Sequence, residues 1–336
     1  MLDGYDLLIK AQCSESMDSL GFSAEDVLES LESEDRFDVK SRLCERLAFL
    51  IYQDSNFGLL PIPKPMETVS KCINGLCKTF VASGFPIENE TFVGPCTSST
   101  SPNSPNHSKE RILCATLLTT PTDSLPEFLT AFEYPSTACL AQKLLDNDER
   151  FLTSLLALLP LIETLDPSSI FHPVSIVLES MNLINYDCEV LIDWLNSELA
   201  ASSLILRILK SNCNEKTRGF WETYRPLKSP QTPPSNAFRD EPTIKSSTSK
   251  PIISLKIIEI VGEQEMTKTL NLRAIETKKV EFKKLALKNG GKFEKWAGMV
   301  VELRKRLRRL LAAGLVAKKL DLILKWCDKF CDVFIQ

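Results

Sequence analysis

Two histidines are the natural candidates for general-base chemistry in this 336-residue chain, because only histidine ordinarily titrates near neutral pH. Nucleophilic hydrolysis needs such a base beside a serine or cysteine. His107 lies in a segment of serine, asparagine and proline, where no regular structure is expected to hold it in place. His172 lies at a predicted helix start, and we interpret it as a capping or packed residue. No G-x-S-x-G segment accompanies either histidine, so no catalytic residue is predicted.

Metal binding would need closely spaced pairs of cysteine or histidine, since structural zinc takes four such ligands. The closest cysteine pairs are Cys72 with Cys77 and Cys327 with Cys331, and neither has a matching second pair. Both pairs fit the apolar stripes of predicted helices. Cysteine is among the most buried residue types, so we interpret these pairs as core residues. No metal and no cofactor are predicted.

Phosphate cradles and organised carboxylate pairs are also missing from the sequence. The glycines of segment 288–292 lack the preceding strand and the G-x-x-x-x-G-K-[ST] spacing of a P-loop. The pairs Asp38 with Glu45 and Asp146 with Asp148 fall on predicted polar faces and turns, where charges are solvated. We therefore predict that the protein is not an enzyme.

The strongest pattern lies near the C-terminus, where residues 296–330 predict two amphipathic helices separated at Gly314. Apolar residues recur there at spacings of three and four, so they share one face, and basic residues occupy the other. Such a helix pair is expected to dock on another surface, with its leucines buried and its arginines attracting the partner. The predicted partner-binding residues are Leu303, Arg304, Leu307, Arg308, Arg309, Leu310, Gly314 and Leu315.

The charge distribution leaves two possible docking surfaces for this pair. The net charge of −4 combines a balance of −13 over residues 1–250 with +9 over residues 251–336. Halves of opposite sign indicate either internal docking or an acidic partner. Residues 151–200 carry seven acidic residues and no Lys or Arg. This window is therefore the expected counter-surface if the basic segment docks on its own chain.

The same basic cluster leaves nucleic-acid binding open as the alternative to a protein partner. Residues 304–309 include five Lys or Arg, and further lysines precede them. Such ridges neutralise phosphates with salt-sensitive, sequence-independent affinity. Aromatic residues for stacking on single strands are not interleaved with this ridge. The cluster also resembles a nuclear-import patch.

The rest of the chain is divided into short segments with helical periodicity. Turns of a few residues separate them, and some are apolar on more than one side, as is typical of helices stacked between neighbours. We therefore predict an all-α fold, with an α-solenoid or armadillo-like helical stack and a short C-terminal helical module. The expected helices cover residues 37–52, 66–81, 109–119, 124–132, 136–145, 149–163, 168–183, 187–195 and 199–210.

Composition predicts the domain boundaries. The helical body is expected over 1–222, with a disordered insert near 94–107. A Pro/Ser-rich linker follows over 223–251, and a basic helical module occupies 252–336. Residues 252–260 are rich in β-branched side chains and could form a strand, but a strand needs a partner, so irregular chain or a short helix is favoured there. A helix is expected over 268–287.

The expected compartments are the cytoplasm, the nucleus or both. The N-terminus begins with acidic residues and has no apolar stretch resembling a signal peptide, so the eleven cysteines are expected to be free thiols. The longest apolar stretch, residues 155–162, is far shorter than the roughly 20 residues that span a membrane. No membrane partner is predicted.

Two stretches resemble the Lines family of α-helical developmental regulators. Residues 185–210, NYDCEVLIDWLNSELAASSLILRILK, are similar to that family's pattern at Tyr186, Asp187, Val190, Leu191, Asp193, Leu195, Leu206, Arg207, Leu209 and Lys210. Residues 301–324 are similar to its short C-terminal region. The matching positions there are Leu303, Arg304, Arg309, Leu310, Gly314 and Leu315.

One departure follows these positions, because residues 316–319 (VAKK) replace the family's Phe-Pro-Tyr-Asn-like turn. The resemblance implies an armadillo-like scaffold that acts in developmental signalling and, in some members, in Wnt-linked patterning and in the nucleus. It implies no catalytic residues. The expected function is accordingly a non-enzymatic scaffold for protein–protein interaction.

Overall fold

The structure, a computed structural model, describes residues 3–84, 107–197, 199–225, 253–261, 264–272, 291–314 and 320–335. The chain divides into two compact units. The first comprises Met1–Arg225 and Gly290–Gln336, and the second comprises Pro226–Asn289. These units differ from the expected division into a body over 1–222 and a module over 252–336, because the C-terminal helices share a unit with the body.

Every described element of the first unit is a helix, in agreement with the predicted helical class. The 3₁₀ helices are η1 (Asp18–Leu20), η2 (Thr122–Ser124) and η3 (Leu159–Glu163). The α-helices are α1 (Gly4–Cys13), α2 (Ala24–Ser33), α3 (Phe37–Asp54), α4 (Lys64–Ser83), α5 (Ser108–Thr119), α6 (Leu125–Leu129), α7 (Thr137–Leu145), α8 (Asp148–Leu158), α9 (Pro173–Leu183), α10 (Cys188–Ser197), α11 (Leu199–Cys213), α12 (Glu215–Glu222), α14 (Lys292–Ala312) and α15 (Asp321–Phe334).

Short polar side chains start several of these helices. Ser23 accepts a hydrogen bond from the backbone N–H of Asp26, and the Asp26 carboxylate accepts one from the backbone N–H of Ser23. This reciprocal capping box satisfies N–H groups that a helix start leaves without partners. At the start of α8, Asn147 Oδ1 accepts from the backbone N–H of Arg150 over 2.8 Å. Such caps fix helix boundaries through local hydrogen bonds.

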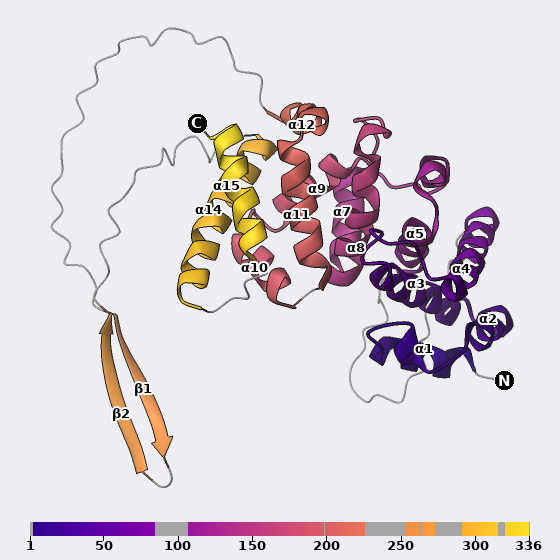
Figure 1. Ribbon diagram of the computed structural model, residues 1–336, viewed down its shortest axis with the longest axis horizontal. Coiled ribbons are helices and arrows are strands. Elements are labelled where there is room, and N and C mark those ends of the chain that lie inside the picture. Colours follow the sequence, from indigo (N-terminus) through magenta and orange to yellow (C-terminus); the bar gives the residue numbers. More distant parts are fainter. Residues whose placement is uncertain are drawn as a thin grey trace. The chain divides into compact units, whose positions relative to one another are not determined.

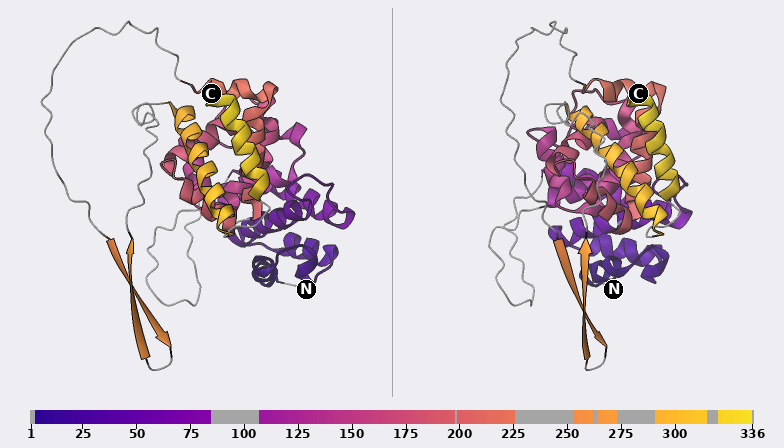
Figure 2. Two further views of the ribbon diagram at one scale, coloured as in Figure 1. Left: turned by 60° about the vertical axis from the view of Figure 1, so that its left-hand side comes forward. Right: turned by 90° about the vertical axis from the view of Figure 1, so that its left-hand side faces the viewer.

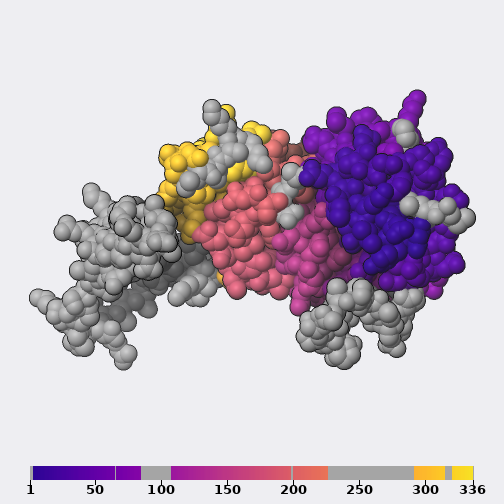
Figure 3. All heavy atoms as spheres, turned by 90° about the horizontal axis from the view of Figure 1, so that it is seen from below, coloured from indigo at the N-terminus to yellow at the C-terminus, as the bar shows by residue number. Residues whose placement is uncertain are grey.

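Within the first unit, one row of helices follows the order of the sequence. Helix α1 packs on α3, α3 on α5, α5 on α8, α8 on α11, and α11 on α15. Figure 3 shows the same progression on the surface, from the indigo N-terminal helices at one end to the yellow C-terminal helix at the other. Helices in the middle of the row have neighbours on opposite sides. This explains why residues 151–158 of α8 are all buried.

The C-terminal helices α14 and α15 lie side by side at one end of this row (Figures 1 and 2). Helix α15 packs on α11, and α14 packs on α9 and α10. Phe293, Trp296, Leu303 and Leu307 of α14 and Phe330 of α15 are buried in the continuous hydrophobic core of the unit. Fully burying side chains of this size contributes roughly 1.5–3 kcal/mol each. The helix pair therefore completes the core of the stack.

The second unit contains a β-hairpin, which corrects two predictions. Strand β1 (Ile253–Val261) pairs antiparallel with β2 (Gln264–Leu272), and Leu255 lies opposite Leu270. Residues 253–261 are therefore a strand, where irregular chain or a short helix was expected. Residues 268–272 belong to β2, so the helix predicted from residue 268 is wrong over this part. The pairing partner of β1 is β2, the segment that follows β1 in the sequence.

Several other predictions fall outside the described residues. The predicted insert near 94–107 is described only at His107, and the predicted linker over 223–251 only at residues 223–225. Residues 273–287 of the predicted helix and Leu315 also lie outside them.

Candidate functional site

The leucines of the predicted partner-binding surface are not equally accessible. Leu303 and Leu307 are 0% exposed, because they pack inside the chain's own core. These two leucines are therefore buried against the chain's own helices and are not available to a partner in this arrangement. Leu310 is half-buried, and it packs at the margin of the same core. Gly314 follows α14, is exposed, and has a φ of +67°, a conformation that glycine adopts without steric cost.

Most of the predicted cationic ridge is engaged in ion pairs within the chain. Arg308 contacts Asp328 at 2.5 Å, and Arg304 lies 3.7 Å from the same carboxylate. Both pairs connect α14 with α15. Arg306 and Lys305 lie 3.3 and 3.7 Å from Glu302, one turn earlier on α14. Arg309 is exposed and forms no ion pair with a described residue.

The basic segment docks on the acidic window that the sequence singled out. Lys292, at the start of α14, forms an ion pair with Glu179 of α9. Arg306 forms another with Glu189 of α10. Both carboxylates lie within residues 151–200, so the structure shows internal docking, one of the two alternatives that the charge distribution left open. Exposed ion pairs contribute about 0.2–1 kcal/mol each, so apolar burial supplies most of the docking free energy.

Two tryptophans form the centre of this junction. Trp296 of α14 and Trp221 of α12 stack at a centroid distance of 6.4 Å with 23° between the ring planes, and both are buried. The Trp296 indole N–H donates to Asn212 Oδ1 of α11 over 3.2 Å. The Trp221 indole N–H donates to Ser211 Oγ over 3.0 Å. Each buried ring thus has a partner for its polar atom.

Docking leaves one mixed apolar and basic face of α15 at the surface, which we call the α15 stripe. Its members recur at helical spacing: Leu322, Lys325, Trp326 and Lys329. Leu322 is 47% exposed. The ammonium of Lys329 lies 4.5 Å from the Trp326 ring centroid, and that of Lys210 from α11 lies 5.8 Å away. The apolar repeat in the sequence indicates only the buried face of this helix.

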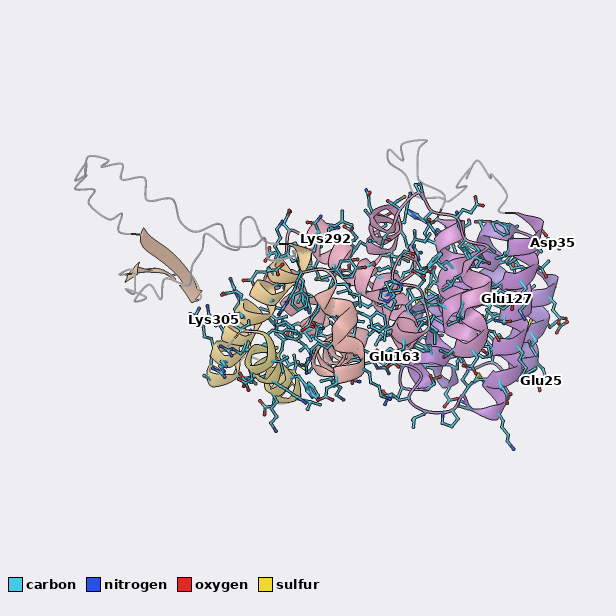
Figure 4. All side chains as sticks on the ribbon, turned by 90° about the horizontal axis from the view of Figure 1, so that it is seen from above. Glu25, Asp35, Glu127, Glu163, Lys292 and Lys305 are labelled. Atoms are coloured by element: carbon cyan, nitrogen blue, oxygen red, sulfur yellow. The ribbon has the colours of Figure 1, made fainter. Side chains whose placement is uncertain are left out.

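Charged residues are distributed unevenly along the first unit. Figure 4 places Glu25 and Asp35 at the N-terminal end and Lys292 and Lys305 at the opposite end. Residues 3–35 contain ten Asp or Glu and a single basic residue. The acidic end therefore lies far from the α15 stripe and does not neutralise it within the same chain.

The histidines lie in two different environments. His172 is fully buried, and its Nε2 lies 3.3 Å from the carbonyl oxygen of Ile162. Burial lowers the pKa of His172. His172 precedes α9 without capping it through its side chain, so it is a packed residue. His107 precedes α5, where Nδ1 lies 4.0 Å from Asp146, and burial lowers the pKa of His107 as well.

The described cysteines are free thiols. Cys77, Cys327 and Cys331 are buried, and Cys72 is half-buried. Burial raises the pKa of Cys77 and of Cys327 to about 12. Within the described residues, no group of three or more His, Cys, Asp or Glu is arranged to hold a metal ion.

A polar cavity of about 280 Å³ lies among α1, α3, α5 and the start of α8. Its charged lining comes from residues far apart in the sequence: Arg42, Glu45, Arg46, Arg111 and Glu149. Arg150 lies beside it and holds Glu45 through two hydrogen bonds, of 2.5 and 3.1 Å. No spacing in the sequence indicates this cluster, because only the tertiary fold brings α3 next to α5 and α5 next to α8.

Among the described residues, no helix combines the length and apolar character that crossing a membrane requires. Comparison of the chain with models of protein families, with curated proteins and with solved structures gives no match.

Proposed function

We propose that the protein is a non-enzymatic scaffold whose helices form an armadillo-like solenoid. The contacts from α1 through α3, α5, α8 and α11 to α15 follow the sequence order, as they do in stacked-helix proteins. Such proteins present extended surfaces for binding other proteins. We propose that this scaffold acts in the cytoplasm, in the nucleus or in both.

The α15 stripe is the proposed partner-binding surface, and the observation that carries the proposal is its composition. Leu322 is exposed, and Trp326 lies among Lys210 and Lys329. Aromatic residues that combine apolar area with a polar edge are enriched where proteins bind one another. The lysines select an acidic partner through charge complementarity. Arg309, which is exposed on α14 and has no ion pair among the described residues, extends the same positive field.

Membership of the Lines family is part of the proposal. The two stretches that resemble the family are residues 185–210 and 301–324. The first covers α10 and nearly all of α11, and the second covers much of α14 and the start of α15. These helices pack directly, α10 on α14 and α11 on α15. Two resembling stretches that form one packed unit support a shared origin and, with it, a role in developmental signalling.

Proximity labelling in cells with the full chain tests the scaffold function. The test variant is Lys325→Glu with Lys329→Glu, which reverses charge on the α15 stripe without touching a buried group. Lys216→Glu, a single charge reversal at an exposed position on α12, is the control. We expect the test variant to lose a set of acidic proteins that the wild type and the control both label. An identical set from all three chains would remove the α15 stripe as the binding surface.

Nucleic-acid binding is the second candidate function, and one observation favours it. Trp326 lies among lysines, and an aromatic ring beside cations is the arrangement that stacks on single-stranded bases. The arginine ridge contributes less than the sequence suggested, since Arg304, Arg306 and Arg308 already pair with carboxylates. A mobility-shift titration at low salt, with single-stranded and duplex DNA, tests this alternative. Absence of a shift with either would eliminate it.

A further inference from the structure

The cavity among α1, α3, α5 and α8 has an excess of positive charge. Three arginines line it, Arg42, Arg46 and Arg111, against two carboxylates. Arg150 adds a fourth guanidinium directly behind Glu45. The remaining lining is neutral and includes the amides of Gln12 and Asn147. A pocket with more guanidinium than carboxylate groups attracts anions.

Both carboxylates of the lining are already engaged. Glu45 accepts two hydrogen bonds from Arg150, a bidentate arrangement that is strong because both partners are charged. Glu149 accepts from Arg46 over 2.7 Å. The other donors of Arg46 reach the carbonyl oxygens of Ala11 and Ser14, near the end of α1. These contacts fix Arg46 and Arg150 in place and offset the negative charge of the two glutamates.

The guanidinium of Arg42 donates no hydrogen bond to a described residue. It forms no hydrogen bond and no ion pair with any described residue, and its Nε is buried without an acceptor. Leaving a buried donor unsatisfied is costly, and more so for a charged group. Arginine presents five N–H donors in a planar fork that matches the oxygens of phosphate. An unused fork that lines a polar cavity is therefore arranged to receive an oxyanion.

We propose that this cavity binds a phosphate group, either free phosphate or the phosphate monoester of a small molecule or side chain. Arg42 donates to it directly, while Arg46, one turn further along α3, and Arg111 of α5 add positive potential. The volume of about 280 Å³ accommodates phosphate together with a few atoms of the group that carries it. Because this site lies on helices that do not include α15, it is independent of the partner surface proposed above.

The test measures phosphate binding to the full chain by isothermal titration calorimetry at neutral pH and constant ionic strength. The ligands are inorganic phosphate and a short peptide containing phosphoserine, with chloride as the reference salt. The variant is Arg42→Met, which keeps an unbranched side chain, of about the length of the apolar stem of arginine, and removes the guanidinium fork. Arg309→Met, at an exposed position without an ion pair among described residues, is the control with the same change in net charge.

We expect the wild type and Arg309→Met to bind phosphate alike, and Arg42→Met to bind about tenfold more weakly or worse, as loss of a charged hydrogen bond implies. Arg42→Lys, which keeps the charge without the fork, is expected to fall between them. Tighter binding of the peptide would identify a phosphoprotein ligand, and equal binding a small phosphate. Both outcomes support the site.

Two results would overturn the proposal. One is equal affinity of the wild type and Arg42→Met, and the other is no binding of either ligand to the wild type. Misfolding does not confuse the comparison, because Arg42 has no described partner to lose. Without phosphate, Arg42→Met is expected to unfold at the same denaturant concentration as the wild type or higher.

Discussion

The indole N–H of Trp296 donates a hydrogen bond to Oδ1 of Asn212, and both side chains are buried. This bond connects α14, which follows the second unit, to α11, which precedes it. Asn212 is oriented for it, because its Nδ2 donates to the carbonyl oxygen of Ile208 over 2.6 Å. This buried polar pair therefore adds a directional contact to the apolar packing that holds α14 on the stack.

Removing Trp296 should undock the C-terminal helices. Trp296→Ala deletes a ring that is 1% exposed and stacks on Trp221, so we expect a loss of about 3–5 kcal/mol in the free energy of unfolding. Urea unfolding followed by circular dichroism measures it. Trp326→Ala is the control, since this ring is only half-buried. A loss for Trp296→Ala no larger than for the control would contradict the assignment of the junction.

The hydrogen bond itself can be separated from the packing. Asn212→Leu removes the acceptor and leaves the indole N–H of Trp296 unsatisfied, which should cost about 1–3 kcal/mol. Combining it with Trp296→Phe removes both polar atoms, and the double variant should be more stable than the sum of the single losses predicts. Additive losses would mean that the two side chains do not interact.

The ion pair of Glu45 with Arg150 should be more important for stability than those on the surface. The side chains are 19% and 7% exposed, so removing one partner leaves a largely desolvated charge behind. We expect Glu45→Gln to cost up to about 3–5 kcal/mol. Glu67→Gln, which removes the exposed pair with Lys71, is the control and should cost under about 1 kcal/mol. Similar losses for both variants would argue against the desolvation of Glu45.

Cysteine reactivity should report the docking of α15. Cys13 is exposed, whereas Cys114 and Cys327 are buried, and burial raises the pKa of both buried thiols to about 12. Because the thiolate is the reactive form, a thiol reagent should modify Cys13 first in the folded protein. In Trp296→Ala, Cys327 should become reactive well before Cys114, as read by mass spectrometry of digested samples. Simultaneous exposure of both would mean that α15 does not open separately from the stack.

The periodicity of apolar residues and the helix-breaking residues between segments were sufficient to locate most of the helices. Helix α3 was expected over 37–52 and covers Phe37–Asp54, and α5 was expected over 109–119 and covers Ser108–Thr119. Both have apolar stripes and clear breaks, which are properties of the local sequence. Helices α1, α2 and α12 were not predicted, although Ser23 and Asp26 form a capping box that the sequence contains.

Periodicity could not identify what each apolar face packs against. Leu303 and Leu307 were correctly predicted to be buried, but the sequence cannot distinguish a partner from the chain's own α-helices. The charge balance was more informative, because it singled out the acidic window that contains Glu179 and Glu189. The cavity could not be predicted from the sequence, because Arg42 and Arg111 lie on different helices whose packing depends on the whole stack. The strand partner in β2 was missed because its sequence is more polar than that of β1.

Protonation of His172 should weaken the fold in mildly acidic solution. Burial lowers the pKa of His172 in the folded protein below its usual value of about 6.5, although the contact with the Ile162 carbonyl and the charge of Asp166 oppose this shift. Below that value the unfolded chain binds more protons than the folded one. The contribution of neutral, buried His172 to the free energy of unfolding is therefore complete above about pH 6.5. It falls as the pH decreases from there through the folded-state pKa. The steepest expected slope for one group is about 1.4 kcal/mol per pH unit.

Urea unfolding of His172→Gln as a function of pH isolates this effect. The variant should be less stable than the wild type at neutral pH, because it loses the imidazole ring, whose centroid lies 5.5 Å from that of the Phe220 ring. Its stability should nevertheless change less as the solution is acidified. His107→Gln is the comparison, since burial lowers the pKa of His107 too but its side chain remains 20% exposed. The same acid dependence of stability in the wild type and in His172→Gln would contradict the prediction. It would mean that His172 takes up protons in the folded state as readily as in the unfolded chain, despite its complete burial.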